Sequence, residues 1–137
     1  MTRTIGDIMA TNLLTFTPET SIHKAIHLLL EKRFSGAPVL DTDGNLVGVL
    51  SKKDCLKIVF STGYHHDHGG QVHEYMSKNV ETLSADTGLV EAAEYFIKSH
   101  FRRFPVVQDG KLVGQISRHD ILRTLIEESA TAKLKPV

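Results

Sequence analysis

The sequence contains one cysteine, Cys55, and no tryptophan among its 137 residues. A single cysteine excludes an internal disulfide and fits a reducing compartment, so we expect the protein in the cytoplasm. The chain also lacks an apolar run of the roughly 18 residues that a membrane span needs. Its first residues, MTRTIGDIMATN, lack the continuous apolar core of a secretory signal. These absences predict a protein with no membrane association.

The sequence has no excess of positive charge either. Lys and Arg together number 16, as do Asp and Glu, which gives a formal net charge of zero. Proteins that bind nucleic acid usually carry a basic excess, so we expect no nucleic-acid partner. No nucleophile, base and orienting acid occur in a catalytic arrangement, because the Ser, His and Asp of SRHD lie on one turn and do not converge. We therefore expect no enzymatic activity.

What the chain does contain is an internal repeat. The stretch LVGVLSKKD (46–54) returns as LVGQISRHD (112–120), 66 residues further along. Upstream the identities continue at a spacing of 67, as Met9 with Met76 and Pro38 with Pro105, and one deleted residue in a turn explains the change. The period exceeds the roughly 20–50 residues of solenoid repeats, which indicates a duplicated subdomain.

Each copy predicts the same order of elements, β-α-β-β-α. A short strand (13–17 and 80–84) precedes a helix with an apolar stripe at i, i+3, i+4 and i+7. A strand led by proline then enters an Asp-Gly turn, which favours a tight antiparallel hairpin, and a second helix (about 52–60 and 118–128) closes the copy. The stripe consists of Ile22, Ala25, Ile26 and Leu29 in the first copy and of Leu89, Ala92, Ala93 and Phe96 in the second.

Helix caps and domain boundaries follow from this order of elements. Thr20 or Ser21 should cap the first helix, and Asp86 or Thr87 its counterpart. We expect a first repeat at 5–60, a linker at 61–72, a second repeat at 73–129 and a tail at 130–137. Since about 55 residues bury little surface alone, the fold should be α+β, with the sheets of the two repeats packed together about a pseudo-twofold axis.

The repeated motif allows two interpretations. Ser51 and Ser117, each followed three residues later by Asp54 or Asp120, are close to a capping box at the start of the closing helix. The same helix N-terminus offers N–H groups to a phosphate, and a carboxylate there can accept the hydroxyls of a ribose. The two roles are compatible.

The duplicated unit, closed in each copy by G-h-x-h-S/T-x-x-D (h, apolar), resembles a tandem pair of cystathionine-beta-synthase (CBS) domains, a Bateman module. The resemblance extends from Ile5 to about Ser129. It implies a regulatory sensor without a prosthetic group, which binds adenosine-containing ligands (AMP, ADP, ATP, S-adenosylmethionine or NAD) in clefts between the repeats and signals to an effector protein.

The resemblance also implies roles for individual residues. Asp54 and Asp120 would bind ribose, and Ser51 and Ser117 would lie near ribose or phosphate. The segments entering each repeat would contact the base through Thr15, Thr17, Thr82 and Ser84.

The two copies differ in charge near the motif. Arg102 and Arg103 stand where the energy-sensing kinase's gamma subunit carries phosphate-binding basic residues, and Arg118 and His119 add charge beside the same helix. The first copy has Ser35, Gly36 and Ala37 in place of the two arginines, which predicts one good phosphate site and one weaker one. Arg103 as a solvated strand-edge residue is the alternative for that position, and an interaction module whose Ser-Asp pairs only cap helices is the alternative for the protein.

Three further features of the sequence suggest other sites or contacts. The linker histidines (His65, His66 and His68), together with Asp67 and His73, suggest a metal, but a polar linker is expected there, and we predict no metal site. Cys55 aligns with Ile121, which predicts a packed and inert thiol. Excess apolar residues on the closing helices predict a symmetric homodimer. These residues are Leu56, Ile58, Val59 and Phe60, with Ile121, Leu122, Leu125 and Ile126.

Overall fold

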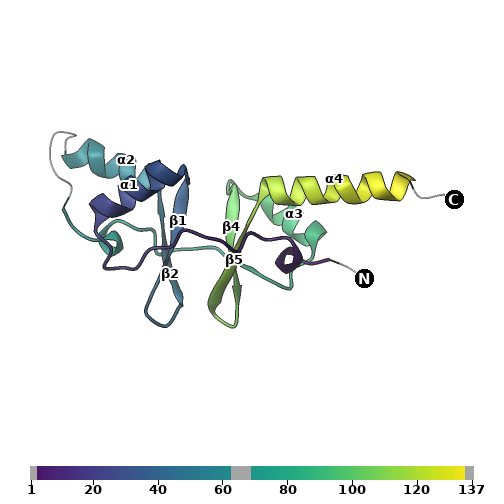
Figure 1. Ribbon diagram of the computed structural model, residues 1–137, viewed down its shortest axis with the longest axis horizontal. Helices are drawn as coiled ribbons and strands as arrows, with labels where there is room; N and C mark the ends of the chain where they lie inside the picture. Colours follow the sequence, from purple (N-terminus) through teal and green to yellow (C-terminus); the bar gives the residue numbers. More distant parts are fainter. Residues whose placement is uncertain (1–2, 63–68, 135–137) are drawn as a thin grey trace. The chain divides into compact units, whose positions relative to one another are not determined.

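The computed structural model describes residues 3–62 and 69–134. The chain forms two compact units: unit 1 combines Met1–Asn12 with Glu81–Val137, and unit 2 is Leu13–Val80. Each unit contains one antiparallel hairpin and two α-helices, and in each the hairpin turn points away from the helices (Figure 1). The predicted α+β class and the duplication are thereby confirmed.

Unit 2 contains α1 (Ile22–Lys32), the hairpin of β1 (Gly36–Leu40) and β2 (Leu46–Ser51), α2 (Lys52–Thr62) and a short 3-10 helix, η2 (Val72–Glu74). The apolar stripe predicted for α1 faces the core, because Ile22, Ala25 and Leu29 are buried. Ser21 caps the helix by accepting a hydrogen bond from the backbone N–H of Lys24 (3.4 Å). Of the two candidates for this N-cap, Ser21 is therefore right and Thr20 is wrong.

Unit 1 repeats this plan with a three-stranded sheet in the order β3-β4-β5, in which β3 is parallel to β4 and β4 antiparallel to β5. The last helix runs well past its neighbour α3 (Figure 1). The elements are η1 (Ile5–Asp7), β3 (Leu83–Ser84), α3 (Leu89–Lys98), β4 (Arg103–Gln108), β5 (Lys111–Ser117) and α4 (Arg118–Leu134).

The hairpin turns explain the change in repeat spacing. In unit 1 the turn is the two-residue Asp109–Gly110, with φ values of 52° and 79° that suit the tight turn predicted from Asp-Gly. In unit 2 the connection between the paired residues Leu40 and Leu46 has five residues, one more than the connection between the equivalent pair Val107 and Leu112. The Asp41 carboxylate closes it by accepting the backbone N–H groups of Asp43 and Asn45, both at 2.9 Å.

Several predicted boundaries are wrong. The first strand of each copy is shorter than predicted, because Phe16 forms only a single bridge with Val39 and β3 pairs with β4 through two residues. Gly88, and neither Asp86 nor Thr87, occupies the N-cap of α3. Both closing helices are longer than predicted, most of all α4.

The segment that begins each repeat packs into the hydrophobic core of the other repeat. Ile5 is fully buried in the core of unit 1 with residues of the second repeat, and Val72 is fully buried in the core of unit 2 with residues of the first. Backbone hydrogen bonds hold them there, from Ile5 N–H to the Thr87 carbonyl (2.8 Å) and from Val72 N–H to the Thr20 carbonyl (2.9 Å). The two repeats therefore exchange equivalent segments.

The expected linker at 61–72 is structured at both ends. Ser61 belongs to α2, and Gln71 forms a β-bridge with Ser21. The linker histidines lie outside the described residues. Within residues 3–62 and 69–134, none of the helices is long and apolar enough to cross a bilayer.

Candidate functional site

The repeated Ser-x-x-Asp motif lies where the second strand of each hairpin passes into the closing helix. In unit 2, the Oδ2 of Asp54 accepts hydrogen bonds from the backbone N–H (3.0 Å) and the hydroxyl (2.9 Å) of Ser51. The Ser51 Oγ accepts in turn from the Asp54 backbone N–H (3.0 Å). This reciprocal pattern is a capping box, which confirms the capping interpretation of the motif.

Unit 1 has the same box with one hydrogen bond fewer. The Oδ2 of Asp120 accepts from the Ser117 backbone N–H, and the Ser117 Oγ accepts from the Asp120 backbone N–H, both at 3.1 Å. Among the described residues, the Ser117 hydroxyl has no acceptor for its own proton. The Nη2 of Arg123, a residue that the sequence analysis did not consider, lies 3.6 Å from the Asp120 Oδ1. Its i, i+3 spacing on the helix was the available signal.

The glycines of the two motifs are required by packing. A Cβ on Gly48 would meet the thioether of Met76 and the Ser77 carbonyl, and one on Gly114 would meet Met9 and the Ala10 carbonyl. Val49 forms a β-bridge with Ser77, just as Gln115 does with Ala10. The repeated glycine thus admits a neighbouring chain segment to the strand.

The strongest difference between the units is Arg103. It stands on β4 directly opposite Ser117, as Gly36 stands opposite Ser51 in unit 2. The Nε of Arg103 is buried and has no hydrogen-bond partner among the described residues. A buried guanidinium N–H without an acceptor costs free energy, so an anionic or polar acceptor bound beside Ser117 would fit this position.

Gly36 cannot be replaced by a long cation without a change in the hairpin. A Cβ there would lie 2.9 Å from the Leu50 carbonyl oxygen and 3.2 Å from the Ser51 Cα. The close approach of the β2 backbone to Gly36 therefore excludes an arginine here, and this maintains the difference in charge that the sequence predicts between the repeats.

The other basic residues are distributed around the same junction. Arg102 is exposed, and its backbone carbonyl accepts from the Arg118 N–H (3.0 Å), as the Ser35 carbonyl accepts from Lys52 in unit 2 (2.8 Å). The Nε of Arg118 donates to the Phe101 carbonyl (2.9 Å). His119 is exposed on the first turn of α4. The structure thus places Arg103 opposite Ser117, while the Arg118 side chain is bound to the Phe101 carbonyl.

The residues expected near a base flank the bridges that lead into each repeat. Thr15 and Thr17 are exposed on either side of the buried Phe16, which forms a parallel bridge with Val39. Thr17 and Thr20 share a hydroxyl–hydroxyl hydrogen bond of 2.9 Å.

The second repeat has the same alternation, with Thr82 and Ser84 exposed around the buried Leu83. Leu83 is opposite Val106 in the β3–β4 register, and the Ser84 Oγ accepts from the Asp86 N–H (3.3 Å). In each unit, two exposed hydroxyl side chains therefore project from the segment that pairs with the first hairpin strand.

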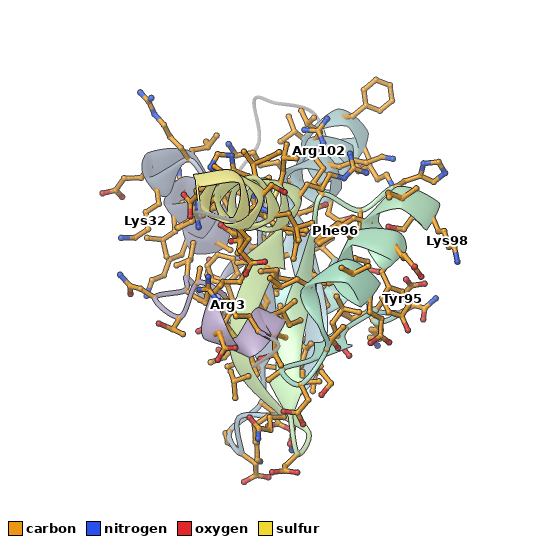
Figure 2. All side chains as sticks on the ribbon, turned by 90° about the vertical axis from the view of Figure 1, so that its right-hand side faces the viewer. Arg3, Lys32, Tyr95, Phe96, Lys98 and Arg102 are labelled. Atoms are coloured by element: carbon orange, nitrogen blue, oxygen red, sulfur yellow. The ribbon has the colours of Figure 1, made fainter. Side chains whose placement is uncertain are left out.

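A shallow apolar groove of about 530 Å³ lies between α3 and α4 in unit 1. In Figure 2 the Phe96 side chain turns from α3 toward α4, whereas Tyr95 and Lys98 point away. The groove is lined by Ala93, Phe96, Ile97, Ser99, Arg118, Ile121, Leu122 and Leu125.

The apolar residues of the closing helices divide into three groups by exposure, of which Val59 and Leu125 form the half-buried one. Ile58 and Ile121 are buried in the cores of their own units, so their assignment to a surface was wrong. Leu56, Phe60, Leu122 and Ile126 are 69%, 92%, 64% and 60% exposed, as a surface that binds another chain would require.

Cys55 is packed as the sequence predicts. The residue is buried in the core of unit 2. Burial, together with the nearby Asp54 charge, raises the pKa of the Cys55 thiol to about 11, which keeps it protonated and unreactive near neutral pH. In residues 3–62 and 69–134, no three or more His, Cys, Asp or Glu side chains are grouped as a metal site.

Comparisons with known proteins agree with this arrangement. The chain is 30% identical to the chloroplastic CBS domain-containing protein CBSX2 of Arabidopsis thaliana over 90% of this chain and 64% of the relative. It is 34% identical to the A-adding tRNA nucleotidyltransferase of Aquifex aeolicus, of which it spans only 14%. These curated relatives are therefore longer than this chain, and the second carries the similar region inside an enzyme.

Solved structures are similar over nearly the whole chain. CBSX2 in complex with AMP superposes with a TM-score of 0.80 at 33% identity, covering 93% of this chain and 98% of that one. The CBS domain pair of protein MJ0100, solved with 5-methylthioadenosine and S-adenosyl-L-methionine, gives a TM-score of 0.75 at 25% identity, covering 93% and 99%. The family profile of the CBS domain matches residues 5–61 and 72–127, and the chain therefore belongs to the CBS domain family as a tandem pair.

Proposed function

We propose that this protein is a regulatory module that binds an adenosine-containing ligand and passes the signal to a partner chain. The similar CBS pairs that were solved with AMP and with S-adenosyl-L-methionine support this ligand class. The ligand is a reversible effector, and no prosthetic group is required. Binding at the motif of unit 1 is stronger than at the motif of unit 2.

The observation on which this proposal depends is the buried Nε of Arg103 beside Ser117. A phosphate oxygen is a good acceptor for a guanidinium N–H, and the N-terminus of α4 adds positive potential at the same place. The hydroxyl of Ser117 supplies a further donor, whereas that of Ser51 already donates to Asp54. Unit 2 has Gly36 in place of the arginine, so its motif suits a ligand without phosphate, or binds phosphate more weakly.

Calorimetry with AMP, ADP, ATP and S-adenosylmethionine on the wild type and on Arg103→Ala tests the proposal. Losing one hydrogen bond between charged groups costs about 1.5–3 kcal/mol, so nucleotide affinity should fall about tenfold to a hundredfold, while binding of adenosine is unchanged. Lys98→Ala removes an exposed cation from α3 of the same unit and should change neither. If none of the four ligands binds the wild type, the proposal is wrong.

The protein acts as a binding module in this proposal, with no reaction of its own. The signal leaves through the exposed residues of the closing helices, which we propose hold a second copy of the chain and an effector protein. Supporting observations are the 92% exposure of Phe60 and the 64% exposure of Leu122. Sedimentation velocity at micromolar concentration should show a dimer that Leu122→Asp dissociates, and a monomeric wild type would contradict this part.

The proposal also includes a cellular compartment, and it has one alternative. We keep the cytoplasm as the compartment, because one buried, protonated thiol fits a reducing environment. The alternative is an interaction module that uses its Ser-Asp pairs only as helix caps, which the capping geometry favours. Ligand-dependent unfolding separates the two, since a nucleotide at 100 times its Kd should add about 2.7 kcal/mol to the free energy of unfolding.

A further inference from the structure

Helix α1 of unit 2 presents two exposed histidines on one face. His23 and His27 stand at positions i and i+4, which lie one above the other on an α-helix. Their ring centroids are 4.4 Å apart, with an angle of 58° between the ring planes. Neither side chain belongs to the core of unit 2, whose buried residues on this helix are Ile22, Ala25 and Leu29.

We propose that His23 and His27 form a binding site for a divalent transition metal of the class that prefers imidazole, namely Cu²⁺, Ni²⁺ or Zn²⁺. Imidazole nitrogen suits these ions, whereas Mg²⁺ and Ca²⁺ prefer oxygen. The chain supplies two ligands, and water occupies the remaining coordination positions. This surface is separate from the Ser-x-x-Asp motifs, so the inference does not depend on the proposed nucleotide site.

The distance between the rings agrees with a two-imidazole chelate. With metal–nitrogen bonds of about 2.0–2.1 Å, each ring centroid is about 3.2 Å from the metal, and an angle of about 90–110° at the metal places the centroids about 4.5–5.2 Å apart. The observed 4.4 Å differs from the lower end of this range by only a small turn of either ring. Exposed imidazole rings turn easily about χ2, so little rearrangement is needed.

The second repeat indicates that the fold does not require these histidines. The positions of α3 that correspond to His23 and His27 hold Val90 and Glu94, and α3 forms the same buried stripe. The histidine pair is therefore a property of unit 2 alone.

The helix dipole opposes a cation near the start of α1, by about 0.3–1 kcal/mol for exposed groups. Glu31 stands a further turn along the same face, at i+4 from His27, and its negative charge partly offsets this cost.

The test is a calorimetric titration with Ni²⁺ on protein without an affinity tag. The parent for all variants carries alanine at the linker histidines, so that their imidazoles do not contribute. We expect one equivalent of Ni²⁺ to bind, and NMR signals of His23 and His27 to broaden first. Loss even of a group that only orients a metal ligand costs about 10–100-fold in affinity, so His23→Ala and His27→Ala should each weaken binding at least about tenfold.

Two controls distinguish a chelate from a general effect of histidine. His100→Ala removes another exposed histidine and should leave Ni²⁺ binding unchanged. Lys24→His/His27→Ala keeps two histidines on α1 but places them at adjacent positions, which point to different sides of the helix, and should bind no better than His27→Ala. Circular dichroism of every variant checks that α1 is still folded.

Three results would overturn the inference. They are absence of Ni²⁺ binding by the parent, unchanged affinity in folded His23→Ala and His27→Ala, and binding by the adjacent-histidine variant as tight as by the parent.

Discussion

Replacement of Asp54 by alanine should lower the free energy of unfolding more than replacement of Asp120, whereas replacement of Asp120 should lower ligand affinity more. Both carboxylates cap a closing helix, but Asp54 accepts two hydrogen bonds from Ser51, and Asp120 accepts one from Ser117. The additional ion pair of Asp120 with Arg123 joins atoms 3.6 Å apart, and the arginine side chain is 48% exposed. A pair this exposed adds little to the free energy of unfolding.

The magnitudes follow from these contacts. Loss of a helix cap costs about 0.5–2 kcal/mol, so we expect about 1 kcal/mol for Asp120→Ala and a value nearer 2 kcal/mol for Asp54→Ala. Ligand affinity should follow the reverse order, because Arg103 and the free hydroxyl proton of Ser117 belong to unit 1. We expect a tenfold to hundredfold loss for Asp120→Ala, about 1.5–3 kcal/mol, and a smaller loss for Asp54→Ala.

Urea unfolding without ligand measures the first quantity, and calorimetry with AMP at a temperature where all variants are folded measures the second. Ser117→Ala is a useful addition, since it removes the same cap while leaving the carboxylate in place. If Asp120→Ala lowers the free energy of unfolding as expected but binds AMP like the wild type, Asp120 is a helix cap only. Equal affinity losses in both aspartate variants would contradict the predicted difference between the units.

Three shorter predictions concern packing, the thiol and the linker. Gly114→Ala should destabilise unit 1 by about 1–3 kcal/mol, because its Cβ would overlap Met9 and lie 2.8 Å from the Ala10 carbonyl, and chemical unfolding that matches the wild type would contradict this packing. Iodoacetamide should modify Cys55 at pH 8 only after denaturation. The raised thiol pKa should also make the free energy of unfolding fall between about pH 9 and 11, because the unfolded chain loses its thiol proton first. A free energy of unfolding that follows the same pH dependence as in Cys55→Ala would refute this. Replacing the linker histidines by alanine should leave AMP affinity within about threefold, which is under 1 kcal/mol, and a larger loss in calorimetry would assign them to the ligand site.

The candidate site could be predicted in part from the sequence. The two Ser-x-x-Asp boxes depend on contacts within one helical turn, so the spacing alone predicted their hydrogen bonds. Arg103 was identified by comparing the two copies, but its buried Nε depends on the packing around β4 and could not be read from spacing. The hydrogen bond from the Arg118 Nε to the Phe101 carbonyl joins residues 17 positions apart in the chain, and it was missed for the same reason.

The sequence by itself determined the duplication, the order of the elements and the buried face of each first helix. These features follow from local periodicity, turn residues and capping residues, which act over a few positions. The strand lengths, the glycine requirement at Gly48 and the exchange of Ile5 and Val72 between the cores were decided only by the tertiary structure. Each depends on which distant segment lies against a strand or fills a core. The two repeats are similar in sequence, so local patterns do not indicate whether a segment packs into its own repeat or into the other one.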